Sequence, residues 1–258
     1  MNRKVCLLTI LFFSISGFAA AQMVTQISVG ADYNFGFLDI DNNFWARTTS
    51  PFPSNNMYRD NSSISSRSTG ISFAMRLLFD PDPDSFLSTG YFLRSRILLG
   101  THMRKEGTLT TSTDSNSPNS QNNNKNYKLT DGELVLVLTD IGIGTSYIFR
   151  PANRFHICFD FGANFSWIQF EDPKIKAEFD YMGLGLITGL SSQVYLTQKV
   201  YLDFGLTSTM GIFSNIKGIH VDGSRNVRYS DGGRWDSASV AFFFHVGWRN
   251  PLKLPGSS

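Results

Sequence analysis

A strict alternation of apolar residues with small or polar ones constrains the fold of this chain more than any other feature. It is clearest from Phe155 to Trp167, where Phe, Ile, Ala or Trp occupies every second position and polar or small residues lie between. A period of two places successive side chains on opposite faces of a β-strand. Because the pattern recurs along the whole chain, it predicts an all-β protein.

The alternating segments predict eight strands in a single antiparallel up-and-down β-barrel, an architecture whose apolar outer face would contact lipid. An extra hairpin within residues 39–68 would raise the number of strands to ten. We expect the barrel to occupy residues 22–250, followed by a tail at 251–258. The predicted strands cover residues 25–38, 69–80, 86–103, 133–149, 155–167, 180–195, 200–212 and 239–248.

The first 21 residues have the pattern of a cleaved signal peptide. Arg3 and Lys4 precede a mostly apolar run at 5–13, and small alanines at 19–21 precede Gln22. The apolar run is shorter than the roughly 20 residues that a membrane-spanning helix needs. Removing this segment leaves equal numbers of acidic and basic residues, which argues against a nucleic-acid partner.

The connections between the predicted strands alternate between short turns and long polar segments. Short turns on one side and long loops on the other are typical of outer-membrane barrels. The polar face of the strands consists mostly of Gly, Ser, Thr and Asn, whereas a water-soluble barrel would carry long charged side chains there. We therefore expect the apolar face to point outward. The long connections lie at residues 39–68, 104–131, 169–179 and 214–237.

With these strands and connections, the chain resembles the small eight-stranded outer-membrane proteins: OmpX, OmpW, the OmpA transmembrane domain and the opacity proteins. The resemblance implies a location in the outer membrane of a diderm bacterium, with lipopolysaccharide and the barrel-assembly machinery as partners. OmpW-type proteins imply a narrow pore or a conduit for hydrophobic molecules. OmpX and opacity types imply a structural or adhesive protein whose loops meet a host or environmental ligand. The chain departs from this group at its C-terminus. Such proteins usually end on an aromatic residue, whereas here the last strand aromatic, Trp248, is followed by residues 249–258.

Seven charged residues share the inward parity of the predicted strands. An unpaired charge in a narrow interior is costly, so we expect these residues to pair across the lumen. They would form either a structural plug of ion pairs or a charged constriction that gates solutes. The cluster comprises Asp32, Arg76, Arg94, Arg96, Asp140, Asp160 and Asp203.

The remaining polar motifs do not indicate catalysis or metal binding. Acidic and His/Asp motifs suited to an omptin-like protease are common by chance, and His and Ser suited to lipid A modification are scattered. We therefore expect no enzyme activity, no cofactor and no metal. The residues weighed for these alternatives are Asp39, Asp41, His102, His156, Cys158, His220, Asp222, Ser239 and His245.

Overall fold

The computed structural model describes residues 22–46, 56–80, 85–113, 135–172, 177–221 and 234–252. The predicted signal peptide lies outside these residues, as does the part of the predicted tail after residue 252. Within the described ranges, no helix is long and apolar enough to cross a membrane.

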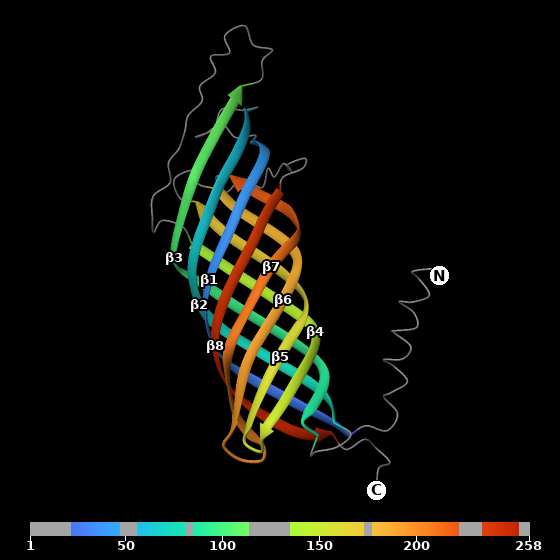
Figure 1. The fold of residues 1–258 in the computed structure, drawn as a ribbon. Coiled ribbons are helices and arrows are strands. Elements are labelled where there is room, and N and C mark those ends of the chain that lie inside the picture. Colours follow the sequence, from blue (N-terminus) through green and yellow to red (C-terminus); the bar gives the residue numbers. More distant parts are fainter. Residues whose placement is uncertain are drawn as a thin grey trace, which may run out of the picture.

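Eight antiparallel strands in the described residues form one closed barrel, as predicted (Figure 1). Each strand pairs with the next along the chain, and β1 closes the barrel by pairing with β8. Strand-favouring aromatic and β-branched residues supply the outward positions of most strands. The strands are β1 (Gln22–Ala46), β2 (Asn56–Asp80), β3 (Leu87–Thr113), β4 (Val135–Ala152), β5 (Phe155–Asp172), β6 (Ala177–Tyr195), β7 (Val200–Val221) and β8 (Arg234–Leu252).

The two ends of the barrel differ, and we call them the turn end and the loop end. At the turn end, residues 153–154 join β4 to β5, and residues 196–199 join β6 to β7. The Thr197 hydroxyl accepts hydrogen bonds from the amides of Lys199 and Val200, which fixes the second turn. Figure 1 shows β1, β2 and β3 extending past the other strands at the opposite, loop end.

The strands are longer at the loop end than the alternation predicted. Much of the predicted 39–68 connection belongs to β1 and β2, which pair from Gln22–Asp80 to Ala46–Asn56. The prediction of an extra hairpin in a ten-stranded barrel is therefore wrong, because the described residues of that connection extend β1 and β2. Likewise β3 continues to residue 113, β5 to 172 and β7 to 221. Polar residues there lack the apolar alternation, but ladder hydrogen bonds still satisfy their backbones.

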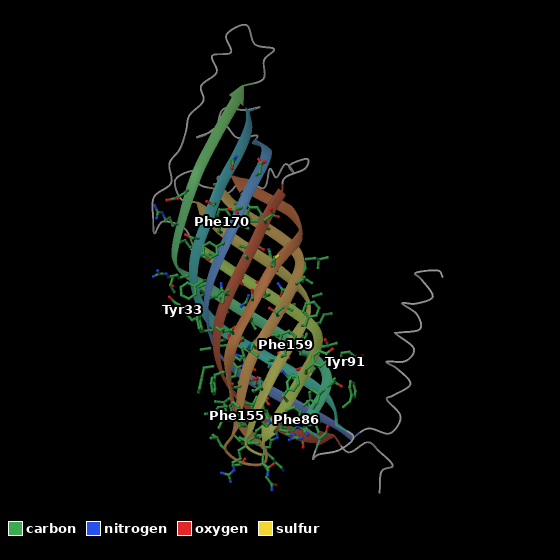
Figure 2. The ribbon with its side chains drawn as sticks, viewed as in Figure 1. Tyr33, Phe86, Tyr91, Phe155, Phe159 and Phe170 are labelled. Carbon is green, nitrogen blue, oxygen red and sulfur yellow. The ribbon has the colours of Figure 1, made fainter. Side chains whose placement is uncertain are left out.

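The outer face carries a continuous belt of apolar side chains. Figure 2 shows Tyr33, Tyr91 and Phe159 on the outside of the barrel, as their parity predicted. The belt ends abruptly towards the loop end of β1, where exposed Phe37 is followed at the next outward positions by Asp39 and Asp41.

Small inward residues let the strands approach closely. Gly144 on β4 pairs with Gly162 on β5, and a Cβ on Gly162 would lie only 2.0 Å from the Ile143 carbonyl oxygen. No other residue type fits such an approach without moving the backbone. The inward glycines therefore permit the tight curl of a narrow barrel.

Candidate functional site: the barrel interior

All seven charged residues of the predicted lumen cluster lie inside the barrel, each at most 6% exposed. Together they form a middle layer, between the turn end and the loop end, that draws on β1, β2, β3, β4, β5 and β7. The layer contains three arginines and four aspartates. Within this layer, charged residues contact partners both on strands that face them across the lumen and on neighbouring strands.

Arg76 on β2 links two aspartates from the opposite wall. Its Nη2 lies 2.8 Å from Asp160 Oδ2 on β5, and its Nη1 lies 2.7 Å from Asp203 Oδ2 on β7. Ser146 also donates a hydrogen bond to Asp160 at 2.6 Å. Because the guanidinium donates to both carboxylates in a fixed planar geometry, this group ties three strands together across the lumen.

Arg96 forms the second ion-pair group, nearer the loop end. Its Nη2 lies 2.5 Å from Asp140 Oδ2 on the neighbouring strand β4. The same nitrogen donates across the lumen to the Ser239 hydroxyl on β8 at 3.1 Å, and Thr209 Oγ1 lies 2.7 Å from that hydroxyl. Arg96 therefore connects β3, β4, β7 and β8 at this level.

Asp32 takes part in a third group with a histidine. His245 Nε2 lies 3.3 Å from Asp32 Oδ1 and 2.5 Å from Ser72 Oγ, while the Ser72 hydroxyl donates to Asp32. Ser28 Oγ lies 3.2 Å from His245 Nδ1. The group contains Ser, His and Asp, but Asp32 and His245 are at most 2% exposed and Ser72 is 3% exposed. It binds β1, β2 and β8 together and offers no surface to a substrate.

Arg94 differs from the other two arginines. Its guanidinium carbon lies 3.9 Å from the centre of the Phe243 ring on β8, a cation–π contact across the lumen. Its Nε and Nη2 have no hydrogen-bond partner among the described residues. Among the described residues, Arg94 is therefore held by an aromatic face and not by a paired carboxylate.

An apolar loop-end layer closes the lumen beyond Arg96, and the sequence analysis missed it. Its residues are buried at inward positions of four of the strands. The signal was present, since leucine and isoleucine take the inward parity where the outward belt ends. The layer comprises Leu38, Ile64, Leu136, Leu138 and Ile168.

The turn end of the lumen is also closed. Val24, Leu78, Ile148 and Cys158 form a buried apolar cluster, which we call the turn-end layer. At the same end, Gln26 Nε2 donates across the lumen to the Tyr195 hydroxyl at 2.8 Å and to Gln193 Oε1 at 3.3 Å.

Tyr201 completes the closure of the turn end. Its ring lies so close over Gly247 that a Cβ there would come within 2.2 Å of a ring carbon. The described interior thus has a polar middle between two layers of apolar and aromatic side chains.

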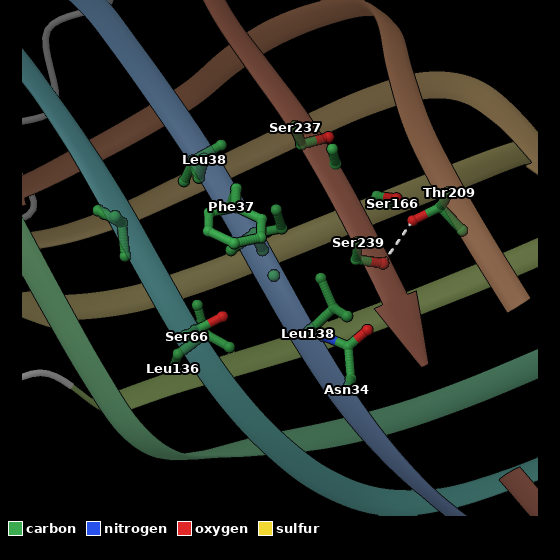
Figure 3. Close-up of a pocket in the computed structure, with 14 residues that line it drawn as sticks. Asn34, Phe37, Leu38, Ser66, Leu136, Leu138, Ser166, Thr209, Ser237 and Ser239 are labelled. Atoms are coloured by element: carbon green, nitrogen blue, oxygen red, sulfur yellow. Dashed lines mark hydrogen bonds between the residues drawn. The ribbon is translucent and has the colours of Figure 1, made fainter. Parts of the chain in front are cut away.

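A cavity lies between the middle layer and the loop-end layer (Figure 3), and we call it the loop-end cavity. The volume of the cavity is about 30 Å³. Apolar side chains of the loop-end layer line much of it, and Asn34, Ser166, Thr209 and Ser239 supply polar groups. The Oδ1 atom of Asn34 has no hydrogen-bond partner among the described residues.

The residues weighed for catalysis do not form a site in the described part of the chain. Asp39 and Asp41 lie exposed on the outer face of β1, whereas His156 is buried at the turn end against the Tyr195 ring. No described group of three or more His, Cys, Asp or Glu residues is placed to hold a metal ion. The side chains of His102 and His220, and all of Asp222, lie outside the described parts.

No family model and no curated protein matches the chain. Among solved structures, the outer-membrane protease OmpT from Escherichia coli is 10% identical, with 91% of this chain and 98% of that chain covered, at a TM-score of 0.43. Ail, the attachment invasion locus protein of Yersinia pestis, is 9% identical, with 89% and 99% covered, at a TM-score of 0.43. OprG from Pseudomonas aeruginosa is 10% identical, with 90% and 98% covered, at a TM-score of 0.45.

OmpT and OprG are described as outer-membrane proteins, and the described residues of the present chain form a closed eight-stranded barrel. The three names include a protease and an attachment protein, so the structural similarity does not indicate an activity for this chain.

Proposed function

We propose that this chain is a non-enzymatic bacterial outer-membrane β-barrel whose lumen is closed and whose loop end carries its function. The outer face supports the membrane location. On β5 the outward apolar side chains run from Phe155 to Trp167. At a tilt of about 45° a stretch of that length would cover roughly 25–30 Å, close to the apolar band of outer-membrane barrels. The change from Phe37 to Asp39 and Asp41 would mark one edge of the bilayer.

The observation that carries the closed lumen is the succession of three layers inside the barrel. The ion pairs of Arg76 cross the middle, Arg96 reaches across it to Ser239, and apolar layers lie on both sides of it. An eight-stranded barrel has an interior that side chains can fill. A hydrated ion would need all three layers to part, so we favour a structural or adhesive protein over a narrow pore.

Among the described residues, the burial of the one group that combines Ser, His and Asp supports a non-enzymatic function. The Asp32–Ser72–His245 group is sealed inside the barrel, where a lipid or peptide substrate cannot approach it. The partners of the protein would therefore be outer-membrane lipid, including lipopolysaccharide, the barrel-assembly machinery and a host or environmental ligand at the loop end.

Epitope insertion in whole cells tests this proposal. One variant carries the epitope between β3 and β4, within residues 114–134, and a matched variant carries it at the turn of residues 153–154. We expect antibody to bind intact cells with the first insertion and to bind the second only after the outer membrane is permeabilised. Equal binding of both in intact cells, or binding of neither before permeabilisation, would refute the proposed orientation.

A further inference from the structure

The charges of the middle layer do not balance among its aspartates and arginines. The layer contains four aspartates and three arginines, all of them buried. Arg76 is paired with two aspartates, whereas Arg96 is paired with one. The remaining two residues, Arg94 and Asp32, balance each other in charge. With every aspartate ionised and His245 neutral, the layer therefore carries one negative charge in excess.

This excess charge is costly because the layer is closed off from water. The turn-end layer lies on one side of it and the loop-end layer on the other. A buried charge without a compensating partner destabilises a fold strongly. One bound cation would remove the excess. No described group of three or more His, Cys, Asp or Glu residues could hold a metal ion, so the cation that fits is a proton.

His245 on β8 is placed to take this proton. Its side chain is fully buried, and its Nε2 lies 3.3 Å from Asp32 Oδ1 on β1. In the ladder between β7 and β8, the residue paired with His245 is Asp203. His245 therefore has an aspartate on each of its two neighbouring strands. Gly30 leaves room for the ring, since a Cβ there would lie 2.6 Å from His245 Cδ2.

The hydrogen bonds around His245 suit an imidazolium, which donates from both ring nitrogens. The Ser72 hydroxyl donates to Asp32, so its oxygen can accept the proton of Nε2 at 2.5 Å. Ser28 Oγ lies 3.2 Å from Nδ1 and can accept the second proton. Each ring nitrogen thus has an acceptor within reach.

The other charged groups of the layer come from four more strands. Arg76 and Arg94 oppose a positive charge on His245, but the aspartates outnumber the arginines. At the level of Asp203, β6 contributes the neutral side chain of Gln193. The charged residues on these strands are Arg76 on β2, Arg94 and Arg96 on β3, Asp140 on β4 and Asp160 on β5.

We propose that the middle layer is a proton-binding site in which His245 is held as an imidazolium at neutral and mildly alkaline pH. The unfolded chain releases this proton near pH 6.5, as free histidine does. The stabilisation is therefore complete below about pH 6.5 and is lost as the pH rises above it. This inference goes beyond the proposed function and does not require the lumen to conduct.

Nitrogen-15 NMR of the histidine side chains in the refolded protein tests the proton directly. The triple variant His102→Gln, His156→Gln, His220→Gln leaves His245 as the sole histidine. We expect both ring nitrogens of His245 to carry protons at pH 7.5. One protonated and one bare nitrogen would overturn the proposal. If the triple variant does not fold, the absence of any imidazolium signal from the wild type at this pH would overturn it equally.

The variant Asp32→Asn is the matched control for charge. It removes one negative charge and keeps the shape of the side chain, so the layer is neutral without a bound proton. His245 should then be a neutral imidazole at pH 7.5 in the same NMR measurement. An imidazolium that persists in Asp32→Asn would overturn the proposal that the excess negative charge holds the proton.

The pH dependence of urea unfolding measures the same proton independently. We expect the unfolding equilibrium constant of the wild type, divided by that of His245→Gln, to rise about tenfold from pH 7.5 to 8.5. Groups that both proteins share, such as Cys158, cancel in this ratio. Asp32→Asn serves as the reference if His245→Gln does not fold. A ratio that stays constant or falls would overturn the proposal, and the epitope experiment would be unaffected, so the two proposals fail separately.

Discussion

Asp140 and Leu138 occupy consecutive inward positions on β4, and between them the interior changes from ion pairs to apolar packing. Asp140 belongs to the middle layer, where Arg96 holds its carboxylate and the strands are tied by directed bonds. Leu138 belongs to the loop-end layer, which fills space without directional contacts and leaves a cavity beside it. The same strand parity therefore serves two different ways of closing a lumen.

The middle layer and the loop-end layer stabilise the barrel in different ways. In the middle layer Arg76 and Arg96 are each held by partners from several strands, so removing one partner leaves a buried charge behind. In the loop-end layer a lost methylene enlarges a void that already exists, and neighbouring side chains can relax into it. We therefore expect the middle layer to dominate stability and the loop-end layer to tolerate change.

The largest expected effect comes from Arg76→Met. The substitution leaves Asp160 and Asp203 buried without their cation, which should lower the free energy of unfolding by about 3–5 kcal/mol. Urea unfolding in detergent micelles, followed by tryptophan fluorescence, measures the change. Arg67→Met is the matched control, because Arg67 is exposed on the same strand and should change stability by less than about 0.5 kcal/mol. Equal losses for the two variants would contradict the role of the middle layer.

A smaller effect is expected from Leu138→Asn in the loop-end layer. The buried amide would lack assured partners, which should cost about 1–3 kcal/mol in the same unfolding experiment. Leu138→Met keeps the volume and the apolar character, so it should cost less than about 1.5 kcal/mol. A larger loss of unfolding free energy for Leu138→Asn than for Arg76→Met would contradict the expectation that the middle layer dominates stability.

Arg94→Met is expected to cost less than Arg76→Met, within the range given for Leu138→Asn. Arg94 is held over Phe243 and not by a paired carboxylate, so its loss should cost about 2 kcal/mol less than the loss of Arg76. A double-mutant cycle with Phe243→Leu should recover most of the cost as coupling between the two residues. A coupling energy near zero would show that the aromatic contact does not hold the guanidinium.

Parts of this comparison could be predicted from the sequence, and the physical reason is periodicity. Alternation from Phe155 to Trp167 predicted the strand and its outward face, and inward parity gathered the seven charged residues. Which aspartate meets which arginine depends on strand tilt and on the stagger of the closed barrel. The inward or outward position of a residue gives neither the tilt nor the stagger. The pairing of Arg76 with Asp160 and Asp203 could therefore be known only from the structure.

Two features escaped prediction for different reasons. Strand ends such as 39–46 and 56–68 are polar, because backbone pairing alone sustains them beyond the apolar belt. The loop-end layer was overlooked because Leu38, Leu136 and Leu138 lie next to outward apolar residues and blur the alternation. Noticing that both parities turn apolar there would have revealed a closed end.

Single-channel current through the reconstituted chain in a planar bilayer tests the closed lumen most directly. The measurement includes the wild type and the double variant Arg94→Ala, Arg96→Ala, which opens the middle layer while leaving both apolar layers in place. The account predicts that both folded proteins are silent. Reproducible conductance steps in the wild type would contradict the closed lumen, and steps in the double variant alone would show that the charged middle layer is the gate.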